Sequence, residues 1–119
     1  MNTKELSSML RQFTGTEHYY RLHKEVVLTD GAKYLADEAR CYWLMDAIAS
    51  YIRFFQTKEY FACCKLVVSN DSAVLTIDDG NGNILATQNI EYTDFHLEQI
   101  NLYGVWSNQF WVIMLTSEY

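Results

Sequence analysis

The sequence of 119 residues contains no proline and three cysteines. It has no CxxC or HxxxH spacing, so the usual patterns of zinc and redox sites are absent. Its longest apolar stretches, 42–45 and 110–115, are far shorter than the roughly 20 residues of a membrane-spanning helix. The first residues also lack an apolar run of signal-peptide length. We therefore expect a cytoplasmic protein with reduced thiols and no membrane association.

Positive charge is scarce in the second half of the chain. Residues 1–60 contain eight basic and eight acidic side chains, whereas residues 61–119 contain one basic residue, Lys65, and seven acidic ones. A single lysine cannot neutralise a row of phosphates, so direct nucleic-acid binding is not expected. The acidity is compatible with a solvated acidic face or with an acidic mimic of DNA. Many of the acids fall in predicted turns, where Asp is favoured for backbone reasons, and this weakens the mimic hypothesis.

Hydrophobic residues make up 50% of the chain and charged residues 20%, which excludes disorder and predicts a single folded domain over residues 1–119. A chain of this length hides roughly 65% of its unfolded surface, so it needs no disulfide or metal for stability.

The first half of the chain predicts two or three helices. Asn2, with Glu5 three residues later, is typical of a capping box that opens a helix to about residue 13. Thr29 and Asp30 predict a second helix start. The strongest apolar stripe at helical spacing covers 42–55. A short strand is favoured at 26–28.

From residue 60 the apolar period changes to two, which is typical of strands. The pattern predicts an α+β fold, with two or three N-terminal helices packed on an antiparallel sheet of about four strands. The last strand is apolar on both faces, which predicts a central position or a subunit contact. The strands are expected at roughly 60–69, 73–79, 84–91 and 110–115.

The segment Asp79–Asn83 predicts a hairpin turn. A calcium loop beginning there would need Gly and Glu where Ile84 and Ile90 stand. The glycines match neither a phosphate-binding loop nor a dinucleotide fingerprint. No metal and no cofactor is therefore expected.

Three carboxylates are candidates for chemistry: Glu17, Asp30 and Asp94. Glu17 follows one predicted helix, Asp30 begins another, and Asp94 follows a predicted strand. If these loops converge, the carboxylates could bind a cation or act as acid and base, together with Thr16. Backbone capping is the alternative explanation of the same residues. A structure that separates Asp30 from Asp94 removes the first hypothesis.

Aromatic residues make up 15% of the chain, and several lie in segments that are not obviously interior. Tyr and Trp bury a large area while keeping a polar tip, which suits protein interfaces. We therefore expect a non-catalytic interaction module, homodimeric or bound to another protein, acting through an aromatic and acidic surface. The aromatic residues could instead belong to the ordinary core of a small domain. The alternative function is a small enzyme or a ligand- or metal-binding domain that uses the three carboxylates. The candidate interaction residues are Tyr92, Tyr103, Trp106 and Trp111.

Several short strings, taken together, resemble an uncharacterised family of small bacterial proteins known as a domain of unknown function. The resemblance covers nearly the whole chain and implies a single compact cytoplasmic domain, without implying any activity. The strings are Phe13-Thr14-Gly15-Thr16-Glu17, Leu28-Thr29-Asp30-Gly31, Tyr42-Trp43-Leu44, Tyr92-Thr93-Asp94-Phe95 and the final Ser117-Glu118-Tyr119.

Overall fold

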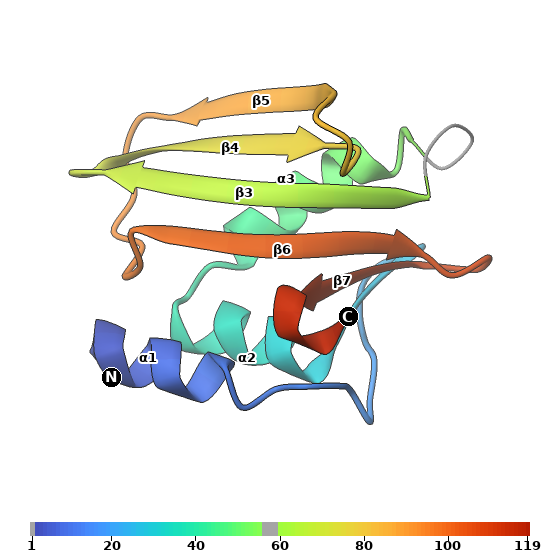
Figure 1. The fold of residues 1–119 in the computed structure, drawn as a ribbon, viewed down its shortest axis with the longest axis horizontal. Coiled ribbons are helices and arrows are strands. Elements are labelled where there is room, and N and C mark those ends of the chain that lie inside the picture. Colours follow the sequence, from blue (N-terminus) through green and yellow to red (C-terminus); the bar gives the residue numbers. More distant parts are fainter. Residues whose placement is uncertain (1, 56–59) are drawn as a thin grey trace.

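A computed structural model describes residues 2–55 and 60–119, and shows a mixed, mostly antiparallel sheet with helix α3 across one face and with α1 and α2 drawn below β6 (Figure 1). In Figure 1 the other face of the sheet is toward the reader and α3 lies behind the strands. The elements are α1 (Thr3–Leu10), β1 (Tyr20–His23), β2 (Val26–Leu28), α2 (Asp30–Glu38), α3 (Tyr42–Ile52), β3 (Phe61–Ser69), β4 (Ser72–Asp78), β5 (Ile84–Ile90), β6 (Gln99–Trp106), β7 (Trp111–Leu115) and the 3-10 helix η1 (Thr116–Glu118).

The helix starts follow from side-chain caps. Asn2 Oδ1 accepts from the Glu5 N–H at 2.8 Å, and Thr29 Oγ1 accepts from the Ala32 N–H at 3.2 Å, as both capping patterns predict. Helices α2 and α3 are separate because Arg40 adopts a φ of 51°, a left-handed conformation that ends the first helix.

The sheet has the strand order β1-β2-β7-β6-β3-β4-β5. Neighbouring strands are antiparallel, except that β2 and β7 are parallel. The last strand of the chain therefore lies between the N-terminal hairpin and the rest of the sheet. The prediction of a central position for the 110–115 strand is confirmed.

Two parts of the predicted fold are wrong. The sheet has seven strands rather than about four, and the helices are not all N-terminal, because β1 and β2 lie between α1 and α2. The α+β class and the strands at 60–69, 73–79 and 84–91 are confirmed to within a few residues. Strand β6 was not predicted, because Gly104 interrupts its alternating pattern and Tyr103 and Val105 are apolar on the outward side.

The core lies between the helices and one face of the sheet. Alternate residues of the central strands are buried there, such as Leu66 on β3, Leu102 on β6 and Ile113 on β7. Ile48 and Ile52 of α3 are likewise fully buried. We call the other face, which carries Lys65 of β3 and Tyr103 of β6, the open face; the end of the C-terminal turn reaches it through Tyr119. None of the described helices has the length and apolar content that a membrane crossing requires.

Gly104 sets how closely α3 approaches the sheet. A Cβ at this position would lie 3.4 Å from Ile52 Cδ1 and 3.7 Å from Ala62 Cβ. One methyl group therefore just fits, and a larger side chain would press on a fully buried helix residue.

We expect Gly104→Val to lower the free energy of unfolding by about 1–3 kcal/mol through overpacking. Gly104→Ala is the matched control and should change it by less than about 1 kcal/mol. Urea denaturation of the two variants measures the difference. Equal destabilisation by alanine and valine would show that α3 does not pack against Gly104 as described.

Candidate functional site

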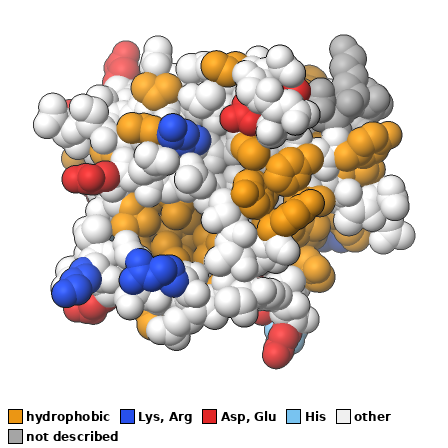
Figure 2. Space-filling view, viewed as in Figure 1, with side chains coloured by type: hydrophobic (Ala, Val, Ile, Leu, Met, Phe, Trp, Pro, Cys, Tyr) orange, Lys and Arg blue, Asp and Glu red, His pale blue; other side chains and the backbone are white. Residues whose placement is uncertain are grey.

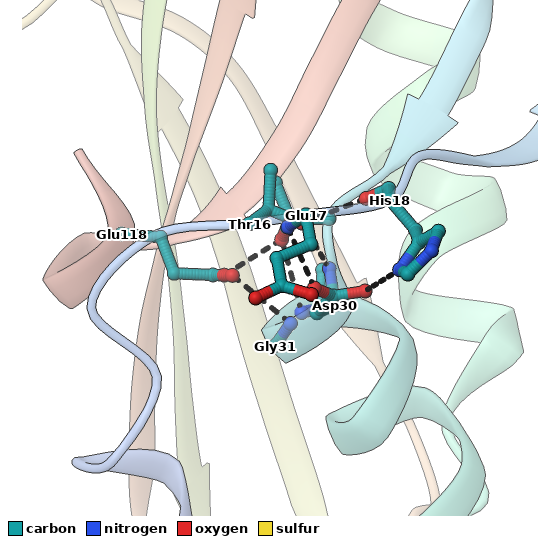
Figure 3. Close-up of polar contacts among 8 residues, drawn as sticks. Thr16, Glu17, His18, Asp30, Gly31 and Glu118 are labelled. Atoms are coloured by element: carbon teal, nitrogen blue, oxygen red, sulfur yellow. Dashed lines mark hydrogen bonds and ion pairs between the residues drawn. The ribbon is translucent and has the colours of Figure 1, made fainter.

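Three segments of the chain meet at the N-terminus of α2 (Figure 3). The Asp30 N–H donates to Thr16 Oγ1 at 2.8 Å, and the Glu17 N–H donates to Asp30 Oδ2 at 2.9 Å. The loop after α1 is therefore fixed to the first turn of α2 by reciprocal bonds. Two of the predicted candidates, Glu17 and Asp30, are brought together, although Glu17 takes part through its backbone.

The third segment is the C-terminal turn, which contributes Glu118. Its Oε1 accepts from Thr29 Oγ1 at 2.6 Å and from the Leu115 N–H at 3.0 Å, and its Oε2 accepts from the Gly31 N–H at 3.0 Å. A carboxylate at a helix N-terminus satisfies unpaired N–H groups and is favoured by the helix dipole. The position that an external anion would take is thus filled by the chain itself. We call Thr16, Thr29, Asp30, Gly31 and Glu118 the α2 clamp.

The Asp30 carboxylate is held in its ionised form. The backbone N–H of Glu17 lowers the pKa of Asp30, and hydrogen bonds from Tyr20 and Thr16 add to the effect against the cost of desolvation. The hydrogen bond between Tyr20 and Asp30 in turn raises the pKa of Tyr20. The Nδ1 atom of His18 lies 3.8 Å from Asp30 Oδ1. A carboxylate with a lowered pKa and bonded oxygens is a poor general acid, so the contacts are those of a structural cap.

Asp94, the third carboxylate candidate, lies elsewhere. It lines a hollow of about 380 Å³ with Arg40 and His96, next to the C-terminal end of α2. Because a nine-residue helix is roughly 13 Å long, this hollow is well separated from Asp30 at the other end. Within residues 2–55 and 60–119, no group of three or more His, Cys, Asp or Glu side chains could hold a metal ion.

The cysteines provide no reactive thiolate. Burial raises the pKa of the Cys41 thiol to about 12, and burial also raises that of Cys64. The pKa of the half-buried Cys63 is raised by desolvation and then by the nearby Asp78. A raised thiol pKa favours the protonated form, whereas nucleophilic catalysis by cysteine needs a lowered one. The three cysteines therefore lack the environment of a catalytic thiolate.

The acids of the β4–β5 turn bind their own backbone. Asp79 Oδ1 accepts from the N–H groups of Asn81 and Asn83 at 2.8 and 3.2 Å, and Asp78 Oδ1 accepts from the Gly80 N–H at 2.7 Å. The side chain of Asn83 and these backbone groups lower the pKa of Asp79. This part of the acidic half is turn chemistry, as the sequence predicts.

The four candidate interaction residues have different surroundings. Trp111 is fully buried, and its ring lies 5.7 Å from that of Trp106 on the helix side of the sheet. Tyr103 lies on the open face, where its ring contacts Phe61 at 4.9 Å and Tyr119 at 5.4 Å. Figure 2 shows hydrophobic side chains gathered over the start of β3 and the end of β6.

Tyr92, the fourth candidate, is 73% exposed and lies two residues after the end of the edge strand β5. The sequence of β5, Ile84–Ile90, contains no charged residue and no proline. Beside it, Trp43, Ala47 and Ile90 line a hollow of about 450 Å³ that Tyr92 also borders. Sequence reasoning missed this surface, although the absence of charge in β5 was visible there.

A model of the family of unknown function DUF6876 matches residues 4–119, so the chain belongs to this family. No curated protein and no solved structure matches the chain. Three of the strings that carry the resemblance, 13–17, 28–31 and 117–119, supply the α2 clamp.

The α2 clamp predicts that an alanine at Gly31 is destabilising. A Cβ there would lie 2.5 Å from Glu118 Oε1 and 2.6 Å from Leu115 Cδ1. We expect Gly31→Ala to cost about 1–3 kcal/mol, outweighing the gain in helix propensity. Gly15→Ala is the control, because a Cβ there would meet nothing within 4 Å. In a Glu118→Ala background the cost of Gly31→Ala should fall by about 1 kcal/mol, measured as a double-mutant cycle in urea. Strict additivity would contradict the described contact.

The lowered pKa of Asp30 predicts a stability loss in acid. A group whose pKa is lower in the folded state stabilises the fold above its unfolded pKa, about 3.9, and loses that contribution as pH falls through the folded value. We expect Asp30→Asn to flatten the fall of the unfolding free energy below about pH 4. Denaturation curves at a series of pH values measure this. An unchanged slope in the variant would show that Asp30 is not held ionised by these bonds.

Proposed function

We propose that the protein is a non-catalytic interaction module that assembles with a second copy of itself through edge strand β5. The observation that carries this proposal is an exposed edge strand of seven residues without a charge or a proline. An edge strand presents unpaired N–H and C=O groups that another strand can pair with. Monomeric proteins usually protect such an edge with lysine, proline, shortness or bulges.

The two edges of the described sheet differ in this protection. Strand β1 has four residues, a bulge between Arg21 and His23, and a cationic side chain at Arg21. Strand β5 is longer and uncharged, and its irregularity is confined to its start, beside Asp78. The contrast favours β5 as the edge that pairs.

The sequence of β5 is complementary to itself in an antiparallel pairing centred on Gln88. Ala86 and Ile90 lie two residues on either side of Gln88 and share its face of the strand, toward the helices, whereas Thr87 and Asn89 are exposed on the open face. A two-fold axis at Gln88 therefore places Ala86 opposite the partner's Ile90, and Thr87 opposite the partner's Asn89. The partly buried apolar side chains on the helix side of the strand would therefore pack against their counterparts in the second copy.

Helix α3 holds this edge in place. Tyr51 Oη donates to Gln88 Oε1 at 3.0 Å, which joins the helix to the middle of the strand. The hollow between Trp43 and Tyr92 offers apolar room beside the edge for an apolar side chain of the second copy. A fixed edge loses little conformational entropy on pairing, which favours association.

The enzyme alternative has less support. Glu17 and Asp30 serve the α2 clamp through a backbone N–H and an ionised carboxylate, and Asp94 lies at the other end of α2. The three do not share one described pocket. Binding through a surface is the function that the remaining features favour.

The proposed pairing register predicts how charged substitutions on β5 affect the dimer. Thr87→Lys/Asn89→Lys would place lysines opposite each other twice across the two-fold axis, so the dimer should dissociate at concentrations where the wild type is dimeric. Thr87→Lys/Asn89→Glu is the matched control. It places opposite charges across the interface and should remain dimeric. Sedimentation velocity over a concentration series measures both.

Both side chains are exposed in the described chain, so each variant is expected to fold. A wild-type protein that remains monomeric at all concentrations would contradict the proposal. Dissociation of both variants alike, or of neither, would contradict the register and move the contact away from Gln88.

A further inference from the structure

A second surface lies at the opposite end of the sheet, around β1, β2 and β7. A hollow of about 430 Å³ is lined there by six residues. Val27 and Val112, adjacent on parallel strands and each 7% exposed, form part of its floor on the open face. The lining residues are Tyr19, Arg21, Val27, Ser107, Phe110 and Val112.

The walls of this hollow are fixed by local bonds. Ser107 Oγ donates to the Phe110 carbonyl at 2.9 Å and accepts from the Phe110 N–H at 3.2 Å. Asn108 has a φ of 79°, which closes a tight turn between them. The backbone of Phe110 is therefore held in a short closed loop, which limits where its ring can lie beside the hollow.

Arg21 is the one charged residue of the described lining. It pairs with Val27 across β1 and β2, so its side chain begins on the same face of the sheet. Its Nη1 donates to the Lys24 carbonyl at 2.8 Å, and Cζ lies 5.7 Å from the centre of the Phe110 ring. The guanidinium is thus positioned by a backbone bond and an aromatic face, with further N–H groups left to bind a ligand.

The geometry points to a binding site for a carboxylate that carries an apolar group. The apolar body would lie on Val27 and Val112 against the Phe110 ring, and the carboxylate would accept from the Arg21 guanidinium. An uncharged analogue loses the charge-assisted bonds, and an amine meets the like charge of Arg21. The size of the hollow falls in the range of small-ligand sites.

The same chemistry occurs in a free aryl or acyl acid and in the C-terminal carboxylate of a peptide that ends in an apolar residue. Four probes separate these sources: 3-phenylpropionate, 3-phenylpropanamide, a pentapeptide ending in Phe with a free carboxylate, and its amidated form. NMR titration of the ¹⁵N-labelled full chain reports binding through the amide signals of Val27 and Val112 and the Nε–H of Arg21.

We expect each acid to bind with a Kd about tenfold lower than that of its amide, because the acid gains a charge-assisted hydrogen bond to Arg21. Arg21→Gln should reduce that ratio to about twofold or less, and Arg21→Lys should keep part of it. Lys65→Gln is the matched control and should leave the ratio unchanged, because Lys65 is on the open face of β3 and does not line the hollow. Tyr19→Ala should weaken acid and amide alike.

Tighter binding of the free acid would identify a small molecule as the ligand, and tighter binding of the peptide a protein C-terminus. Equal affinity for acid and amide would overturn the proposal. So would signal changes located away from Val27 and Val112, or no binding of any probe up to about 10 mM. A loss of preference in Lys65→Gln would also overturn it, because the effect would then come from net charge.

Discussion

Strand β7 pairs on both of its edges, parallel to β2 and antiparallel to β6. This pairing joins the N-terminal hairpin of β1 and β2 to the other strands of the sheet. Trp111 and Ile113 from β7 are fully buried in the core beneath the helices. The turn that follows carries Glu118 to the N-terminus of α2. Residues 111–118 therefore complete both the sheet and the cap of helix α2.

This dependence explains how much of the fold could be predicted. The starts of α1 and α2 are set by Asn2 and Thr29, whose caps act within three residues and are visible in the sequence. The β3–β4–β5 meander follows from alternation and short turns. The β2–β7 pairing joins segments more than eighty residues apart, and no local pattern encodes such a partner. Strand β6 could not be predicted from its apolar pattern because Gly104 interrupts that pattern. The glycine is there because α3 packs closely against it, and this tertiary contact is not visible in the local sequence.

In the candidate site, too, the local contacts could be predicted from the sequence and the long-range contact could not. The sequence placed Thr16, Glu17 and Asp30 at helix ends, and both capping and chemistry were compatible with that position. The decisive partner is Glu118, whose contact with Gly31 spans 87 residues. Once it is in place, the first turn of α2 has its N–H groups satisfied by the chain itself. The sequence strings shared with the family therefore include the residues of the α2 clamp, which stabilise the fold. The resemblance to the family thus concerns the architecture of the domain more than any chemistry.

The two surfaces we propose for binding are on opposite edges of one sheet, and this gives them a defined relation. Pairing through β5 would continue the sheet into the second copy and leave both β1 edges at its far ends. With strands about 4.8 Å apart, the two Arg21 hollows would be separated by roughly 50 Å along the joined sheet. Neither hollow would be covered by the dimer contact, so assembly and ligand binding would not compete. Two sites on one rigid sheet would favour a partner that presents two apolar carboxylates over one that presents a single group, because the second contact is made at a high effective concentration.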